Sequence, residues 1–158
     1  MPEQFPYIGL LAIAPILVYA AYSDLRQLRI PNWTSIVMLA VFAILLPTLP
    51  MSEILDRVLL ALIVLSLGFV LFAVNALGAG DVKLLSALVL FVPSGQVALF
   101  FLIFSPALLL GIVAICLMRA HPPARMAGWQ SIVTPAAFPM GISIALTGLV
   151  FLALLAMA

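Results

Sequence analysis

At the centre of the sequence stands Gly78-Ala79-Gly80-Asp81-Val82-Lys83, a Gly-x-Gly-Asp stretch that carries an acid and a base. It lies in a chain of 158 residues of which 67% are apolar and 7% are charged. Soluble domains have about 45–50% apolar and about 25% charged residues, so this composition predicts an integral membrane protein. An ionisable side chain at membrane depth costs several kcal/mol and usually marks function. Asp81 is therefore the first candidate for a functional residue.

Apolar segments that are long enough, or nearly long enough, to cross a bilayer as helices follow one another along the chain. We expect six, at residues 7–22, 33–46, 54–75, 82–92, 97–118 and 135–157. The loops between them are short and no linker is seen, which predicts an all-α, polytopic bundle of about six transmembrane helices in a single domain, residues 1–158. The first residues carry Glu3 but no Lys or Arg, unlike a basic signal peptide, so we expect the first helix to be retained.

The basic residues predict the orientation of this bundle. Five of the six Lys and Arg residues fall in loops on one expected face: Arg26, Arg29, Lys83, Arg119 and Arg125. Loops rich in Lys and Arg are usually cytoplasmic, so we expect both termini on the outer side. The sixth, Arg57, lies at the outer face, where we expect it to form a local pair with Asp56.

A second acid, Asp24, lies in the stretch Ser23-Asp24-Leu25-Arg26-Gln27-Leu28-Arg29-Ile30-Pro31-Asn32. It follows the first helix, and the next two helices go out and return, so the topology predicts that Asp24 and Asp81 meet on the cytoplasmic side. The expected fourth helix is short: eleven residues rise only about 17 Å against a hydrocarbon core of about 30 Å. We therefore expect the Gly-Ala-Gly-Asp turn to dip below the surface, with glycines that allow positive φ and close backbone approach.

Two neighbouring carboxyl groups suit the hydrolysis of a peptide bond. They cannot both ionise cheaply, so they share one proton. One can then activate a water molecule while the other protonates or polarises the scissile carbonyl. Helix dipoles predict that Asp24, at the end of the first helix, holds the proton, and that Asp81, at the start of the fourth, is ionised.

No cofactor, metal or nucleic-acid partner is expected from the residue pattern. The sole histidine, His121, lies in a Pro-rich loop without a carboxylate or a cysteine at ligand spacing. The chain has no basic patch of the kind that binds nucleic acid. Plainer interpretations of the motif residues also exist: Asp24 could form a surface ion pair with a neighbouring arginine, Asp81 could cap a helix, and Lys83 could serve only to set the topology.

The two aspartate motifs together resemble the signatures of the type IV prepilin peptidases, which are Gly-x-Gly-Asp intramembrane aspartyl proteases. A third stretch, Phe138-Pro139-Met140-Gly141, resembles the Pro-x-Gly segment in the last helix of that family. The resemblance covers the whole chain and implies that Asp24 and Asp81 are the catalytic pair. It implies these supporting residues: Gly78, Gly80, Lys83, Pro31, Asn32, Pro139 and Gly141.

The resemblance also implies a substrate, which is the leader of a prepilin or pseudopilin. Such a leader is short and basic, usually ends in a glycine before the cut, and precedes a hydrophobic helix. The expected site of cutting is the cytoplasmic side of a bacterial inner membrane, with membrane lipid and the pilus assembly machinery as partners. Longer members carry an extra domain with paired cysteines and also methylate the new N-terminus. This chain has one cysteine, Cys116, so it resembles the compact Flp/Tad-pilus type, and we expect no methyltransferase activity.

Functions of other classes remain open at this stage. A small proton-coupled transporter would use the acids as a relay, and such folds often show internal repeats and acids along a path across the bilayer. This sequence shows no repeat, and both central acids are expected near one face. A non-catalytic pilus or secretion assembly factor would tolerate replacement of either aspartate. Within the enzyme class, an archaeal preflagellin-type peptidase is a further alternative.

Overall fold

The structure is a computed structural model of the chain, and it describes residues 5–120, 128–134 and 138–157. These residues form helices and no strands, which confirms the predicted all-α class. The α-helices are α1 (Phe5–Gln27), α2 (Asn32–Leu45), α3 (Met51–Ala73), α4 (Ala79–Val89), α5 (Val97–Ala120), α7 (Gln130–Val133) and α8 (Met140–Met157). Two short 3₁₀ helices, η2 (Leu46–Thr48) and η3 (Ser94–Gln96), follow α2 and precede α5. His121 and Arg125 lie outside the described residues.

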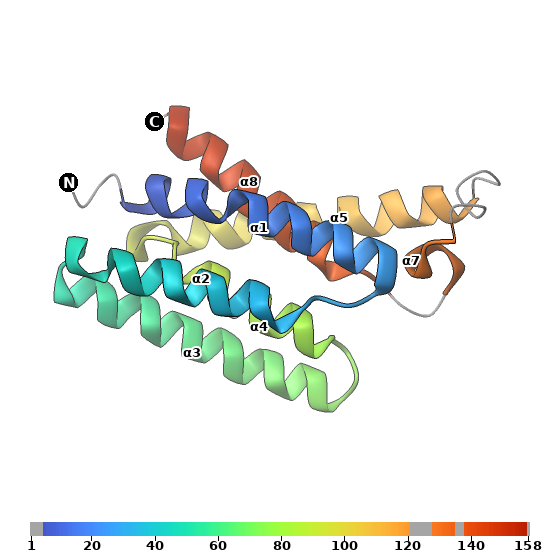
Figure 1. Cartoon of the computed structure of the whole chain (residues 1–158), viewed down its shortest axis with the longest axis horizontal. Helices are drawn as coiled ribbons and strands as arrows, with labels where there is room; N and C mark the ends of the chain where they lie inside the picture. The colour runs from blue at the N-terminus through green and yellow to red at the C-terminus, as the bar shows by residue number, and fades with distance from the viewer. Residues whose placement is uncertain (1–4, 121–127, 135–137, 158) are drawn as a thin grey trace.

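The long helices run roughly antiparallel along one axis of the bundle, as Figure 1 shows. The connection from α1 to α2, the connection from α3 to α4, and the short helix α7 all lie at one end. We call this end, with residues 28–31, 74–78 and α7, the site end. The start of α1 and the end of α8 lie toward the opposite end (Figure 1). The alternating direction of the helices therefore brings the segments after Asp24 and before Asp81 together, as the topology predicted.

Four helical segments are long and apolar enough to cross a membrane: Tyr7–Gln27, Met51–Ala73, Ser94–Ala120 and Met140–Met157. The prediction of a polytopic membrane protein is thus confirmed. The other two expected spans are shorter. The α2–η2 segment covers Asn32–Thr48, and the 11 residues of α4 rise about 17 Å, little more than half of the hydrocarbon thickness.

The short helix α4 lies in the middle of the bundle and contacts α2, α3 and α8. Its Leu84, Leu88 and Val89 side chains are fully buried. By contrast, only 11% of the most apolar 18-residue stretch of α3 is buried inside the bundle. Such exposure of apolar side chains is expected for a helix that faces lipid. The bundle therefore surrounds α4 with other helices and fixes the position of its first turn, which carries Asp81.

The start of α4 corrects two expectations. The helix begins at Ala79, three residues before the expected start, so Asp81 lies inside its first turn rather than in a preceding loop. Gly78 has a φ of −77°, and among the described glycines only Gly128 has a positive φ. Gly78 and Gly80 therefore do not use the positive φ that glycine allows. Close approach does apply, because a Cβ on Gly80 would lie 3.0 Å from Cβ of Ile30.

The expected pairing of Arg57 with Asp56 is also wrong. Arg57 is buried, and its Nε donates to Oε2 of Glu53 at 3.0 Å. Its Nη1 also donates to the carbonyl oxygen of Leu90 at the end of α4, at 3.3 Å. Residues four apart share a helix face, whereas consecutive residues do not. Glu53 in turn accepts a hydrogen bond from the Ser94 hydroxyl, so these side chains tie α3, α4 and η3 together at the end remote from the site end.

Candidate active site

A cavity of about 250 Å³ opens at the site end, and both aspartates line it. Its walls come from the end of α1, the following loop, the start of α2 and the start of α4. The lining residues are Asp24, Leu28, Arg29, Ile30, Asn32, Gly78, Ala79, Gly80, Asp81 and Lys83. Two motifs that are far apart in the sequence therefore share one cavity. Of the residues that the resemblance named, only Pro31, Pro139 and Gly141 do not line it.

Asp24 lies in the last turn of α1 and is 5% exposed. Its Oδ2 accepts a hydrogen bond of 2.8 Å from the backbone N–H of Gly141. Gly141 is the second residue of α8, where backbone N–H groups have no partner within the helix. A Cβ on Gly141 would lie 2.9 Å from this same Oδ2. The lack of a side chain at Gly141 thus allows the N-terminus of α8 to reach the carboxylate.

The surface ion pair considered for Asp24 does not form. Arg26 donates from Nη1 to the hydroxyl of Tyr22 at 3.0 Å. Within residues 5–120, 128–134 and 138–157, the ion pair between Glu53 and Arg57 is the only one. Burial and a backbone hydrogen bond, rather than a neighbouring arginine, therefore define the surroundings of the Asp24 carboxylate.

The loop after Asp24 is held by several hydrogen bonds. The Ser23 hydroxyl donates to the carbonyl oxygen of Arg29 at 2.8 Å. Leu28 ends α1 with a φ of 51°, and its N–H donates to the carbonyl oxygen of Asp24 at 2.8 Å. This left-handed residue closes the helix in the way that a glycine usually does. The Thr34 hydroxyl donates to the carbonyl oxygen of Pro31 at 2.8 Å, so Pro31 leads directly into α2.

Asp81 is 9% exposed and lies in the first turn of α4. Its Oδ2 reaches back toward Gly78, the residue that precedes the helix, where an added Cβ would lie 2.6 Å from it. A first-turn side chain that reaches back in this way is typical of a helix cap, so the helix-capping interpretation is compatible with this one oxygen. The other, Oδ1, is buried and has no hydrogen-bond partner among the described residues. This oxygen is the one left for a water molecule or a substrate.

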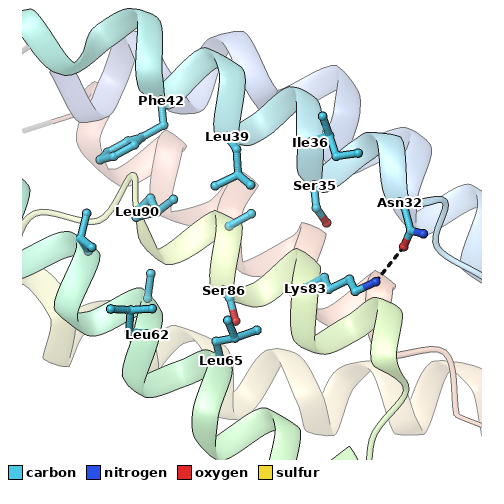
Figure 2. Close-up of a pocket in the computed structure, with 13 residues that line it drawn as sticks. Asn32, Ser35, Ile36, Leu39, Phe42, Leu62, Leu65, Lys83, Ser86 and Leu90 are labelled. Atoms are coloured by element: carbon cyan, nitrogen blue, oxygen red, sulfur yellow. Dashed lines mark hydrogen bonds between the residues drawn. The ribbon is translucent and has the colours of Figure 1, made fainter.

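Lys83 and Asn32 connect the two motifs. The Nζ of Lys83 donates to Oδ1 of Asn32 at 3.1 Å, which joins α4 to the start of α2 (Figure 2). Both residues line the aspartate cavity. Lys83 therefore does more than add a positive charge, because it links the two helix starts on either side of the site.

The electrostatics of the pair differ from the sequence-based expectation. Both carboxyl groups are buried and line one cavity, so ionising both at once would be costly. The sequence placed Asp24 only at the C-terminus of α1, which disfavours negative charge. The structure adds the N-terminus of α8 through Gly141, which favours it. The two helix ends oppose each other at Asp24, so helix dipoles alone no longer favour a proton on Asp24, and that assignment stays a prediction.

Helix α7 borders the site end and was not predicted. Arg119 holds it by donating from Nη2 to the carbonyl oxygens of Ser131 and Thr134, at 2.7 and 3.0 Å. Trp129, just before α7, packs edge-on against Tyr22 of α1 with ring centroids 6.2 Å apart. A helix of four residues is too short to show an apolar period, so the sequence carried no usable signal for it. In the described part of the chain, no group of three His, Cys, Asp or Glu side chains could hold a metal ion.

Comparison with known protein families gives a match to the model of the type IV leader peptidase family over residues 11–116. The matched region includes Asp24, the Gly-x-Gly-Asp stretch and Lys83, and it ends before α7 and α8. Comparisons with curated proteins and with solved structures give no match. The family model covers more than half of the chain, and four helical segments are long and apolar enough to cross a membrane. The chain therefore belongs to the type IV leader peptidase family, and it is a membrane-embedded peptidase.

Proposed function

We propose that this protein is an intramembrane aspartic endopeptidase that removes the leader of Flp-type prepilins or pseudopilins, with Asp24 and Asp81 as its catalytic pair. One observation carries the proposal. The two aspartates come from distant motifs, are both buried, and line one cavity at one end of a membrane bundle. Membership of the leader peptidase family supplies the substrate class, and the single cysteine of the chain favours the compact type without methyltransferase activity.

The proposed mechanism follows from the surroundings of the two acids. The N–H of Gly141 binds the Asp24 carboxylate and so orients it, and the Asp81 carboxylate reaches back toward Gly78 at the start of α4. The ionised member of the pair removes a proton from a water molecule, whose oxygen attacks the scissile carbonyl carbon. The protonated member donates to the carbonyl oxygen, and a proton then passes to the leaving amine as the C–N bond breaks. The pair requires no group beyond water for these steps.

The expected test of this function is leader removal in proteoliposomes. The substrate is a precursor with a short basic leader, a glycine before the cut and an apolar helix. We expect a single cut after the glycine, measured by the masses of both products. With a methyl donor present, the new N-terminus should keep its unmodified mass. An intact precursor would contradict the proposed function, and a methylated product would contradict only the absence of methyltransferase activity.

The orientation is proposed from charge. Arg26 and Arg119 lie in the last turns of α1 and α5, and Lys83 lies near the start of α4, whereas Arg57 lies near the start of α3. Arg29 belongs to the loop between α1 and α2. Because loops rich in basic residues are usually cytoplasmic, this distribution supports a cytoplasmic position of the aspartates. In intact cells, a Gln27→Cys variant in a Cys116→Ala background should be shielded from an impermeant thiol reagent. A Ser52→Cys variant should be labelled. The reverse labelling pattern would place the site on the outer face and contradict cytoplasmic leader removal. Ala124 lies in a loop that we expect on the same face as Gln27, but it is outside the described residues.

A further inference from the structure

A second and larger cavity, of about 630 Å³, lies between α2 and α3 with α4 as its floor (Figure 2). We call it the lateral groove. Its lining residues are Asn32, Ser35, Ile36, Leu39, Phe42, Val58, Ala61, Leu62, Leu65, Lys83, Ser86, Ala87 and Leu90. Asn32 and Lys83 also line the aspartate cavity. The lateral groove therefore adjoins the candidate active site, and the hydrogen bond between Lys83 and Asn32 lies where the two cavities meet.

The groove exists because α2 and α3 do not pack closely against each other, although only a short turn joins them. Each packs on α4 instead. Apolar side chains along both walls stay largely exposed, with 62% of Ile36, 50% of Leu39 and 54% of Leu62 accessible. Lipid solvates such side chains as well as a protein interior does. A groove that opens sideways into the bilayer is therefore stable without a permanent occupant.

The polarity of the groove changes along its length. At the site end lies the hydrogen bond between Lys83 and Asn32. Ser86 follows, but its hydroxyl donates to the carbonyl oxygen of Val82 at 2.7 Å. From there to Phe42 and Leu90 the groove is lined by apolar side chains (Figure 2). The eleven residues from Asn32 to Phe42 are separated by ten helical steps, which rise about 15 Å, or nearly three helical turns. A matching occupant has a polar end at the aspartates and an apolar body of about that length.

We propose that the lateral groove binds the apolar helix of the substrate. The bound part is the first few turns of that helix, directly after the scissile bond. This proposal rests on the proposed function and names where the substrate lies. Only a helix satisfies its own backbone hydrogen bonds in lipid, and an amphipathic or apolar helix docks in a groove through residues spaced three and four apart. The groove holds such a helix beside α4 and presents the preceding peptide bond to Asp24 and Asp81. A lipid acyl chain matches the apolar walls but brings no peptide bond to the polar end.

Photocrosslinking tests this placement without relying on activity. A benzophenone amino acid is placed at Leu39 or Leu62 in the groove of the Asp81→Asn protein, which is reconstituted with the precursor described above. Matched controls are Ile44 and Leu67, which lie on the same two helices, are 75% and 62% exposed, and do not line the groove. We expect crosslinks to the precursor at least about tenfold stronger from the groove positions, and mapped to the segment just after the cut. This factor corresponds to about 1.4 kcal/mol of preference. Equal yields, or crosslinks from the groove to lipid alone, would overturn the proposal.

Filling the groove gives a second readout. Leu39→Trp and Leu62→Trp should each lower kcat/KM for the precursor about tenfold, mainly through KM, because they occlude the docking surface. The matched variant Leu67→Trp should stay close to wild type. Wild-type rates for both groove variants would overturn the groove assignment and leave the catalytic proposal intact. If the wild-type protein itself fails to cut the precursor, the proposed function falls, and the crosslinking yields still decide whether the groove binds the apolar helix.

Discussion

Replacing either Asp24 or Asp81 by asparagine should lower the rate of leader removal by about 10³-fold or more, while the protein still inserts and folds. Both side chains are buried on the wall of one cavity, and each is needed either to activate water or to hold the shared proton. Asparagine keeps the size of the side chain and can do neither. The measurement is the single-turnover rate of precursor cleavage in proteoliposomes, with the amount of folded protein determined for each variant.

Asp56→Asn is the matched control for these variants. Asp56 also belongs to a membrane helix, but it lies near the start of α3, at the end remote from the site end. Its replacement should leave the cleavage rate near that of the wild type. Normal cleavage by Asp24→Asn or by Asp81→Asn would rule out a catalytic pair, and the non-catalytic alternative of an assembly factor would then gain support.

A single methyl group at Gly141 should lower the cleavage rate by about 10²-fold, because small misplacements of a catalytic group have effects of this size. The added Cβ of Gly141→Ala would lie 2.9 Å from both Cβ and Oδ2 of Asp24. Either α8 or the Asp24 carboxylate must then move, and the hydrogen bond from the Gly141 N–H lengthens or breaks. The rate is measured with the same precursor at saturating and at low concentration, to separate kcat from KM.

Gly148→Ala provides a control on the same helix. Its Cβ would lie 2.7 Å from Cδ1 of Leu17 and 3.3 Å from Cδ1 of Leu88, so it also crowds the packing of α8 against α1. It does so away from Asp24, against the ends of flexible side chains. We expect Gly148→Ala to lower thermal stability and to keep most of kcat. If both variants lost activity equally at equal stability, the contact between Gly141 and Asp24 would have no specific role.

Much of the fold was predictable, because apolar length and the distribution of basic residues constrain a membrane bundle strongly. The six apolar helices, the shortness of α4, and the common end of the loops at residues 28–31 and 74–78 all follow from the sequence. The pairing of Arg57 was missed although its spacing from Glu53 was readable, since residues four apart on a helix face each other. Helix α7 could not be predicted, because four residues are too few to show an apolar period. The hydrogen bonds that hold it come from Arg119, which lies twelve positions before Ser131 in the sequence.

The candidate site was predicted in its residues but not in its contacts. The resemblance named Gly141 as a supporting residue, yet nothing in the sequence indicated that its N–H donates to Asp24, because 117 positions separate the two residues. The role of Gly78 was misjudged for a related reason. A Gly-x-Gly pattern suggests a turn with positive φ, whereas here the chain enters α4 directly, and a Cβ on Gly78 would lie 2.6 Å from Oδ2 of Asp81. Contacts between distant segments decide these roles, and one sequence does not contain them.

The central claim is that Asp24 and Asp81 act as one catalytic unit, and the double variant tests it most directly. Single-turnover cleavage is measured for Asp24→Asn, for Asp81→Asn and for the protein with both changes, in the same proteoliposomes. Residues that act as a unit have strongly non-additive effects, so the double variant should retain about the same residual rate as each single variant. A further loss of about 10²-fold or more in the double variant would show independent contributions, and a wild-type rate in either single variant would show that this acid has no catalytic role. Either result would contradict the pair.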